Sequence, residues 1–243
     1  MYIIKLNAIG STNTYLKEMT TITLPKDYTV VVADKQTEGR GQMGTNWHGE
    51  NGKNLTVSVF KHMDTVDIAN QFHISMATAL AISKALKTFR IPQLRIKWPN
   101  DILSADKKIC GILIENVIKN NQLQGSVIGF GLNINQRFFN NLPQASSMNL
   151  LTGIVFDKDE VLSEVLKQFQ HFFQLLEEGK LLDIKSKYEA MMFRSDKPST
   201  FRTHQNEIFT GIIKGVDDNG RLKVFTEDEN IKTFDLKEIT LLY

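Results

Sequence analysis

The sequence has little cysteine and little net charge, and both properties narrow what the protein can be. Its one cysteine, Cys110, cannot form a disulfide within the chain. The 29 basic and 27 acidic side chains leave a net charge of +2, too small for a broad field that attracts nucleic acid or a membrane surface. We therefore expect no nucleic acid and no membrane as partners, and a cytoplasmic location.

Long apolar runs are absent as well. No run of about eighteen apolar residues occurs, and the first residues do not form a charged and then apolar leader. The 243 residues, 42% of them apolar, can bury a proper core in one large domain or in a large and a small one. No helix-turn-helix module fits before Tyr2, so we expect no DNA-binding domain.

Glycine is concentrated in one segment, residues 39–54. Five of the fifteen glycines lie between Gly39 and Gly52. Glycine lets successive backbone N–H groups converge on an anion, and Arg40 adds a fixed fork of donors. The segment therefore predicts a loop that binds phosphate or carboxylate oxygens.

This loop contains the pattern G-x-G-x-x-G from Gly39 to Gly44, but its context argues against a dinucleotide-binding fold. That fingerprint must open a helix, whereas residues 45–54 are polar and aperiodic and lead into a strand-like run, residues 55–60. The phosphate-loop pattern fails too, because no Gly-Lys-Ser/Thr follows. We expect an anion-binding loop of another kind.

Apolar spacing predicts a mixed α/β core. Ser11, Thr12 and Asn13 offer N-cap side chains for a short helix, and Asp157 with Glu160 resembles a capping box. Pro99 should end the strand before it. The strands are expected over residues 2–6, 28–33, 55–60, 94–98, 109–118 and 123–134, the helices over 12–19, 66–86 and 161–176, and a turn over 104–108.

From about Ser195 the sequence pattern changes to short runs in which apolar and polar residues alternate. A strong turn signal, Asp217-Asp218-Asn219-Gly220, separates two of them. This spacing predicts a small β-barrel appended to the α/β domain. We expect a catalytic domain over residues 1–194 and a small C-terminal barrel over residues 195–243.

Several polar clusters end or interrupt the expected strands. They are the glycine loop, Lys97 to Asp101, the Lys107-Lys108 turn and Gly129 to Asn135. Polar groups at strand ends beside a glycine loop fit a site for an anionic, nucleotide-sized ligand. Cys110 and His73 are expected to be buried structural residues instead.

Together, and in this order, the clusters resemble the biotin protein ligases over nearly the whole chain. The motifs are Ser11-Thr12-Asn13, Gln36 with Gly39 to Trp47, Lys97-Trp98-Pro99-Asn100-Asp101, Lys108-Ile109-Cys110-Gly111 and Gly129 to Asn133. The resemblance implies an α+β (α/β) fold: a class II synthetase-like mixed sheet with packing helices, followed by the small C-terminal β-barrel. It also implies the monofunctional type, without the DNA-binding domain of some relatives.

The resemblance implies a reaction that needs ATP, Mg²⁺ and biotin. The carboxylate of biotin attacks the α-phosphate of ATP to give biotinoyl-5′-AMP and pyrophosphate, and a lysine of a biotin carboxyl carrier protein then takes the acyl group. Cationic donors must bring the two anions together. By resemblance Lys108 bridges them with Arg40, and Asp101 orients or deprotonates the incoming amine. Asp101 could equally cap the turn after Pro99.

The resemblance also implies two sets of binding residues. The biotin set is Ser11, Thr12, Gln36, Gly39, Arg40, Lys108, Gly111 and Gly129, and the ATP set is Arg40, Gly41, Gln42, Trp47, Asn100, Lys108 and Asn133. Trp47 could instead be a plain loop anchor. The metal ligands and the identity of the carrier do not follow from the sequence, and a homodimer is compatible with the resemblance without following from it.

Two positions depart from the family. Its loop commonly carries arginine where this chain has Gln42 and Thr45, so we expect a looser grip on the adenylate. Two alternatives also stay open. One is a lipoate or octanoate ligase of the same fold group, against which Lys97 to Asp101 argues. The other is a sensing or scaffold protein without turnover, against which the presence of Arg40, Lys108 and Asp101 argues.

Overall fold

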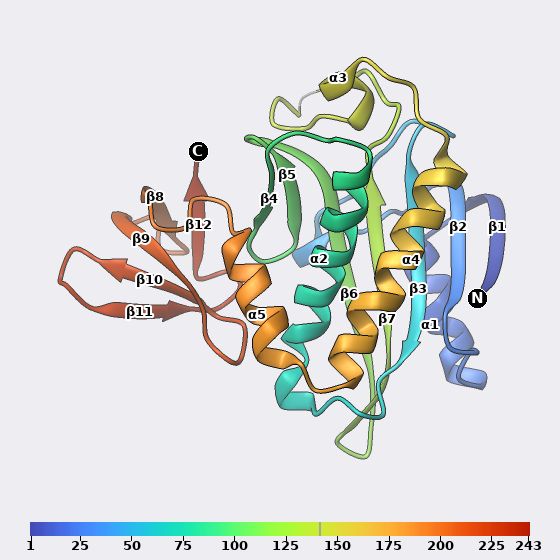
Figure 1. Cartoon of the computed structure of the whole chain (residues 1–243), viewed down its shortest axis with the longest axis horizontal. Helices are drawn as coiled ribbons and strands as arrows, with labels where there is room; N and C mark the ends of the chain where they lie inside the picture. Colours follow the sequence, from blue (N-terminus) through green and yellow to red (C-terminus); the bar gives the residue numbers. More distant parts are fainter. Residues whose placement is uncertain (141) are drawn as a thin grey trace.

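The chain folds into a seven-stranded mixed sheet followed by a smaller five-stranded sheet (Figure 1). The computed structural model describes residues 1–140 and 142–243, with the side chain of Met43 outside the description. The strands of the large sheet are β1 (Tyr2–Ile9), β2 (Thr29–Gln36), β3 (Leu55–His62), β4 (Leu94–Lys97), β5 (Asp101–Ser104), β6 (Lys107–Lys119) and β7 (Gln122–Leu132). Their order is β1-β2-β3-β7-β6-β5-β4, with β1 and β2 parallel and the other neighbours antiparallel.

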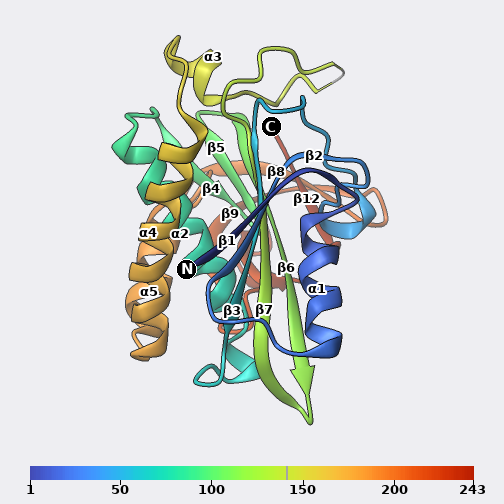
Figure 2. The same ribbon diagram turned by 90° about the vertical axis from the view of Figure 1, so that its right-hand side faces the viewer.

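Helices cover the two faces of this sheet unequally. The helices are α1 (Thr12–Ile22), α2 (Phe72–Thr88), α3 (Met148–Thr152), α4 (Lys158–Glu177) and α5 (Leu181–Ala190), with short 3₁₀ helices η1 (Gln42–Gly44) and η2 (Ile68–Asn70). Figure 2 shows α2, α4 and α5 on one side of the sheet and α1 on the other. On the α1 side, the start of this 11-residue helix and the glycine loop line a hollow that collects polar side chains.

Apolar periodicity explains the packing of both faces. The expected stripe of α4 is buried, from Val161 to Leu176, and α2 packs beside it in the main core. On the opposite face, Leu16 of α1 packs against Val31, Phe60 and Val127 in a smaller cluster. Strand β7 is buried over most of its length, because both of its faces are covered. No described helix is long and apolar enough to cross a membrane.

Most expected elements are present, with shifted bounds. Ser11 caps α1 by accepting from the N–H of Thr14, and Asp157 caps α4 by accepting from two backbone N–H groups. The expected turn over residues 104–108 is wrong in extent: Ala105 and Asp106 alone make it, with Ala105 at a positive φ of 54°, and Lys107 and Lys108 belong to β6. The helix expected over residues 66–86 is α2, which begins at Phe72 because η2 forms a separate turn before it.

The glycine loop does not open a long helix. Its only helical piece is η1, three residues long, and β3 follows, so the loop does not open a dinucleotide-binding unit, as predicted. Cys110 and His73 are buried as expected. Burial raises the pKa of the Cys110 thiol above its usual value, which suits a structural residue.

The second sheet lies beside β4 and α5 (Figure 1). Its strands are β8 (Pro198–Thr203), β9 (Ile208–Val216), β10 (Leu222–Thr226), β11 (Ile231–Phe234) and β12 (Ile239–Leu242), all antiparallel in the order β11-β10-β9-β8-β12. The turn between β9 and β10 reaches the core, where the indole Nε1 of Trp98 donates to the carbonyl of Gly220 at 2.8 Å. The expected fold class, a mixed sheet with packing helices and a C-terminal β-structure, is confirmed.

Candidate active site

A cleft of about 430 Å³ lies on the α1 face of the large sheet and collects most of the expected site residues. Its lining comes from the start of α1, the glycine loop, strands β2 to β7, and the turn before β12 with the start of that strand. None of the expected site residues lines either of two larger hollows, of about 910 Å³ and 950 Å³. The cleft is therefore the candidate active site.

Three glycines make the floor of the cleft. Gly111 of β6 is paired with Gly131 of β7, and Leu113 is paired with Gly129, so these positions share the α1 face of neighbouring strands. A side chain at Gly131 would collide with the ring of Trp47, and one at Gly129 with the side chain of Asn13. Glycine is needed here because the groups above the sheet approach its backbone closely.

Lys108 and Asp101 form the charged pair of the cleft. Lys108 Nζ lies 2.6 Å from Asp101 Oδ1, and the two side chains are 34% and 15% exposed, so the pair is within reach of a ligand. Strand pairing places them: Asp101 opens β5 opposite Gly111, three residues along β6 from Lys108. Asp101 is the single acidic residue among those that line the cleft.

A second lysine lies beside this pair. Lys97, at the end of β4, is directly opposite Asp101, and its Nζ lies 4.7 Å from the ring centre of Tyr243. Burial lowers the pKa of Lys97, Asp101 acts against that shift, and the nearby charge of Lys108 adds to it. Two cations and one carboxylate therefore stand at this end of the cleft.

Trp47 lies over the glycine floor. Its ring lies against Gly111 and Gly131, and Lys108 Nζ is 5.7 Å from the ring centre. The indole Nε1 is buried and has no hydrogen-bond partner among the described residues. Trp47 thus offers both a ring face and an unused donor inside the cleft.

Arg40 lines the cleft but does not join Lys108 and Asp101. Its Nη2 is 2.8 Å from Glu115 Oε2 and 3.2 Å from the hydroxyl of Thr14. Glu115 also pairs with Lys17 and accepts from the amide of Asn13. Burial alone would raise the pKa of Glu115, but hydrogen bonds from Lys17 and Asn13 and the charge of Arg40 lower it, so the carboxylate stays ionised.

The other end of the cleft is polar and uncharged. Gln36 Oε1 accepts from the backbone N–H of Thr12 at 2.8 Å and lies 3.0 Å from its hydroxyl. The hydroxyl of Ser58 lies beneath, 2.7 Å from Thr12 Oγ1 and 2.6 Å from Asn13 Oδ1. This end can match a neutral ring that carries both donors and acceptors.

The structure places nearly all of the expected site residues at the cleft. Those that line it are Ser11, Thr12, Gln36, Arg40, Gly41, Gln42, Trp47, Asn100, Asp101, Lys108, Gly111 and Gly129. Gly39 and Asn133 do not line it. Asn133 is buried beside it, its Nδ2 donates to Ser146, and its Oδ1 has no partner among the described residues.

The sequence motifs assign no site role to several residues that the structure brings to the cleft or to its immediate surroundings. The sequence marks Lys97 only as part of its motif, and Ser58 and Glu115 lie in runs that predict ordinary strands. Leu236, Lys237 and Thr240 come from the second sheet, more than a hundred residues along the chain from the β5–β6 motif. No local pattern could have joined them to it.

Comparison with known proteins follows the same division of the chain. A model of the biotin/lipoate A/B protein ligase family matches residues 6–133. The chain belongs to this family. A second model, the biotin protein ligase C terminal domain, matches residues 195–239. The resemblance to the biotin protein ligases is thus confirmed, and the two matches together include every residue that lines the cleft except Thr240.

Individual relatives agree with this assignment. The chain is 30% identical to the bifunctional ligase/repressor BirA of Bacillus spizizenii, over 99% of this chain and 74% of that protein. It is 28% identical to the biotin--[acetyl-CoA-carboxylase] ligase of Paracoccus denitrificans, over 79% and 82%. The solved biotin protein ligase from Aquifex aeolicus in complex with biotin and ATP is 28% identical and superposes with a TM-score of 0.82, covering 99% and 98% of the two chains.

Proposed function

We propose that this family member is an ATP-dependent biotin protein ligase, which makes biotinoyl-5′-AMP and transfers biotin to a lysine of a biotin carboxyl carrier protein. One observation carries the proposal: a single cleft joins a neutral polar end at Thr12 and Gln36 to a cationic end at Lys108 and Lys97. Biotin has the same division, with a neutral ring and an anionic carboxylate. The relatives named as biotin ligases, and the related structure that holds biotin and ATP, support it.

Adenylation needs positive charge where two anions meet. The biotin carboxylate and the α-phosphate repel each other, and a cation between them lowers the cost of their approach. The position of Lys108, beside Gly111 of the glycine floor and next to Asp101, supports this role. In the ligand-bound state Lys108 would exchange its contact with Asp101 for contacts with the substrate oxygens.

Transfer of biotin to the carrier needs a negatively charged group instead. The attacking lysine is protonated near neutral pH, and only its free amine is a nucleophile. Asp101, released from Lys108 when that lysine binds the acyl-adenylate, would accept or orient the proton of the amine. The Lys108–Asp101 pair would thus serve both steps in turn, Lys108 in adenylation and Asp101 in transfer.

The nucleotide would lie between the glycine loop and the second sheet. Arg40, Gly41 and Gln42 offer donors to the phosphate, Trp47 offers its ring and indole N–H, and Asn100 lines the same end. Lys237 adds a cation from the second sheet. We assign the Oδ1 of Asn133, which has no hydrogen-bond partner among the described residues, to the adenine amino group.

The metal would enter with the nucleotide. The described residues contain no cluster of three or more carboxylate, histidine or cysteine ligands. Mg²⁺ commonly takes one or two carboxylates together with substrate phosphates and water. Asp101 is the carboxylate available for it, and the metal would screen the phosphate charge.

We divide the chain into a catalytic domain, residues 1–194, and a C-terminal domain, residues 195–243, because the second sheet begins at Pro198. Strand β1 forms one edge of the large sheet, which suits a homodimer that pairs strand edges. A reduced, buried Cys110 and the need for ATP suit the cytoplasm.

The test is ATP–pyrophosphate exchange with Mg²⁺, comparing biotin, lipoate and octanoate as the acid. We expect exchange that depends on biotin and on ATP together. Exchange with lipoate or octanoate instead would assign the chain to the lipoate branch of the family. Absence of exchange with all three acids would leave binding without turnover.

A further inference from the structure

A buried chain of hydrogen bonds runs beneath the neutral end of the cleft. It links Glu115, Asn13, Ser58, Thr12 and Gln36, from β6 through α1 and β3 to β2. Ser58 is fully buried, and Thr12 and Asn13 are 2% and 4% exposed. Ser58 does not line the cleft, so any effect on a ligand must pass through its neighbours.

The direction of these bonds is set at the Asn13 end. Asn13 Nδ2 donates to the carbonyl of Leu113 at 3.1 Å and to Glu115 Oε2 at 3.0 Å, and neither group can donate in return. The amide of Asn13 therefore turns its Oδ1 towards Ser58, 2.6 Å away. Because Oδ1 only accepts, the hydroxyl of Ser58 must be the donor.

A serine hydroxyl has one proton, and the bond from Ser58 to Asn13 Oδ1 uses it. The single proton of Thr12 Oγ1 then has two possible acceptors, Ser58 Oγ at 2.7 Å and Gln36 Oε1 at 3.0 Å. It serves the shorter contact, because two hydroxyl oxygens at 2.7 Å with no proton between them would repel each other. Gln36 Oε1 still receives the backbone N–H of Thr12 at 2.8 Å. The proton of Thr12 thus points into the protein, and the oxygen keeps a lone pair for the cleft.

We propose that Ser58 is a positioning residue for biotin, because it holds Thr12 as a hydrogen-bond acceptor for an N–H of the cyclic urea. This inference rests on the proposed function. A urea carries both N–H donors and a carbonyl acceptor. A hydroxyl that could switch between donating and accepting would therefore bind it less well than one held as an acceptor. An acid that lacks the urea gains nothing from this arrangement.

The experiment compares Ser58→Ala with a matched control, Ser126→Ala. Ser126 is also a fully buried serine of the large sheet that donates to an asparagine Oδ1, that of Asn116, but it lies outside the cleft. In pyrophosphate exchange we expect Ser58→Ala to raise the KM for biotin about 10-fold or more, the equivalent of one unpaired buried polar group. The KM for ATP should stay within about 2-fold, and Ser126→Ala should change neither value by more than that.

A thermodynamic cycle tests whether Ser58 acts through Thr12. In a Thr12→Val background the acceptor is already lost, so adding Ser58→Ala should raise the biotin KM by less than about 3-fold. Equal effects of Ser58→Ala in both backgrounds would overturn the proposal. So would equal losses with biotin and ATP, which indicate general damage to the fold.

Two further measurements keep the outcomes distinct. Ser58→Cys preserves volume and provides a weak donor and acceptor, so its biotin KM should fall between wild type and Ser58→Ala, and it decides the case if the alanine variant does not fold. Calorimetric titration of biotin without ATP should show the same order of affinities. If the wild type adenylates lipoate or octanoate but not biotin, the proposed function fails; if it uses biotin normally and Ser58→Ala does too, only the role of Ser58 fails.

Discussion

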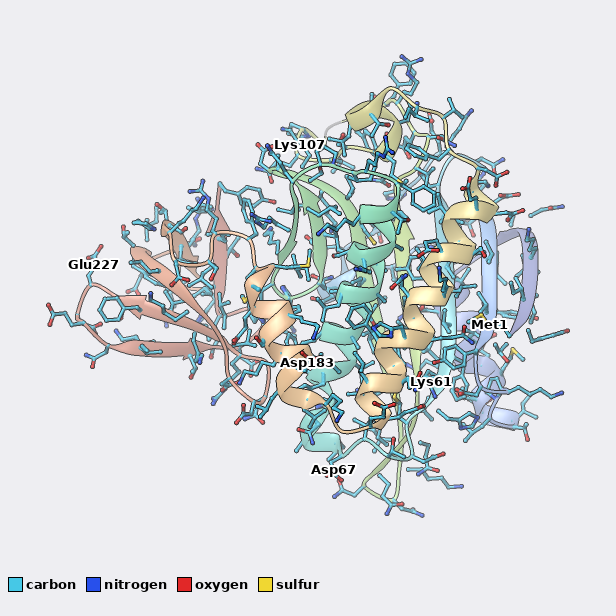
Figure 3. All side chains as sticks on the ribbon, in the orientation of Figure 1. Met1, Lys61, Asp67, Lys107, Asp183 and Glu227 are labelled. Atoms are coloured by element: carbon cyan, nitrogen blue, oxygen red, sulfur yellow. The ribbon has the colours of Figure 1, made fainter. Side chains whose placement is uncertain are left out.

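Lys108 stands next to a second lysine, Lys107, and the alternation of a strand separates their surroundings. Lys107 donates to the carbonyl of Pro143 at the surface near the end of the sheet (Figure 3), whereas Lys108 faces Asp101 in the cleft. The same residue type therefore occupies a solvated position and a site position in adjacent places. Substituting each in turn separates the charge of the site from charge in general.

Replacing Lys108 by alanine should reduce biotin-dependent pyrophosphate exchange by about 10²–10³-fold, the usual cost of losing one preorganised charged donor. The free energy of unfolding should change by no more than about 1 kcal/mol, because the pair with Asp101 is partly exposed. Lys107→Ala is the control and should keep normal exchange. Exchange rates and denaturant midpoints of both variants check this, and normal turnover in Lys108→Ala would contradict the assigned role.

The sequence predicted the residues that the structure brings to the cleft within local motifs, and it missed those that come from elsewhere in the chain. Lys108 and Gly111 follow a recognisable string, as do Ser11 and Thr12. Ser58 lies 46 positions from Thr12 along the chain, and nothing in the sequence of its strand, Leu55–His62, marks this serine as part of a site. A hydrogen bond between distant elements depends on sheet register, which a single sequence does not specify.

At the scale of elements, the glycine loop determines how the cleft closes. Gln42 and Thr45 line the cleft without charge, and the one loop arginine, Arg40, is paired with Glu115. The cationic character of the loop towards the cleft is therefore weak. The bound adenylate should escape more readily than it would with a second loop cation.

We expect Gln42→Arg to slow dissociation of biotinoyl-AMP by about 5-fold or more, since a partly buried charge contact with phosphate is worth at least about 1 kcal/mol. Asn51→Arg adds the same charge to an exposed part of the loop outside the cleft and should leave the rate unchanged. Release of labelled adenylate from the preformed complex measures both rates. Equal dissociation rates for Gln42→Arg and wild type would refute the expectation that the missing loop charge speeds release of the adenylate.

Elements with a strong pattern were predicted and weak ones were not. The apolar stripe of α4 and the caps at Ser11 and Asp157 gave clear signals. Helix α5 was missed because it buries only Ile184 and Tyr188 in its ten residues, too few for a periodic signal. Its position follows from packing against α2 and α4, which is tertiary information.

At the scale of the whole molecule, the second sheet contributes to the cleft. Lys237 lines the cleft, has no ion-pair partner among the described residues, and sits at a positive φ of 84°. Lys237→Ala should raise the KM for ATP about 3-fold or more and leave the KM for biotin unchanged, as expected for one partly screened phosphate contact. Lys232→Ala, which removes an exposed lysine of the same sheet paired with Asp228, is the control. Steady-state exchange kinetics would show an unchanged ATP KM if Lys237 plays no part.

The same sheet is held to the core through Gly220. This glycine has a positive φ of 83°, a side chain there would collide with the ring of Phe72, and its carbonyl receives the indole N–H of Trp98. Gly179 has a similar φ of 70° but open space around it. Comparing alanine at the two positions therefore separates backbone strain from close packing.

Gly179→Ala should cost about 1 kcal/mol of unfolding free energy, the strain of alanine at positive φ. Gly220→Ala should cost about 1–3 kcal/mol more, because the ring of Phe72 must also move. Guanidinium unfolding of both variants measures the difference. Because Trp98 belongs to the motif that carries Lys97 and Asp101, moving Gly220 should also raise the KM for ATP, while Gly179→Ala should not. Equal stabilities and equal kinetics for the two variants would mean that this turn does not couple the second sheet to the cleft.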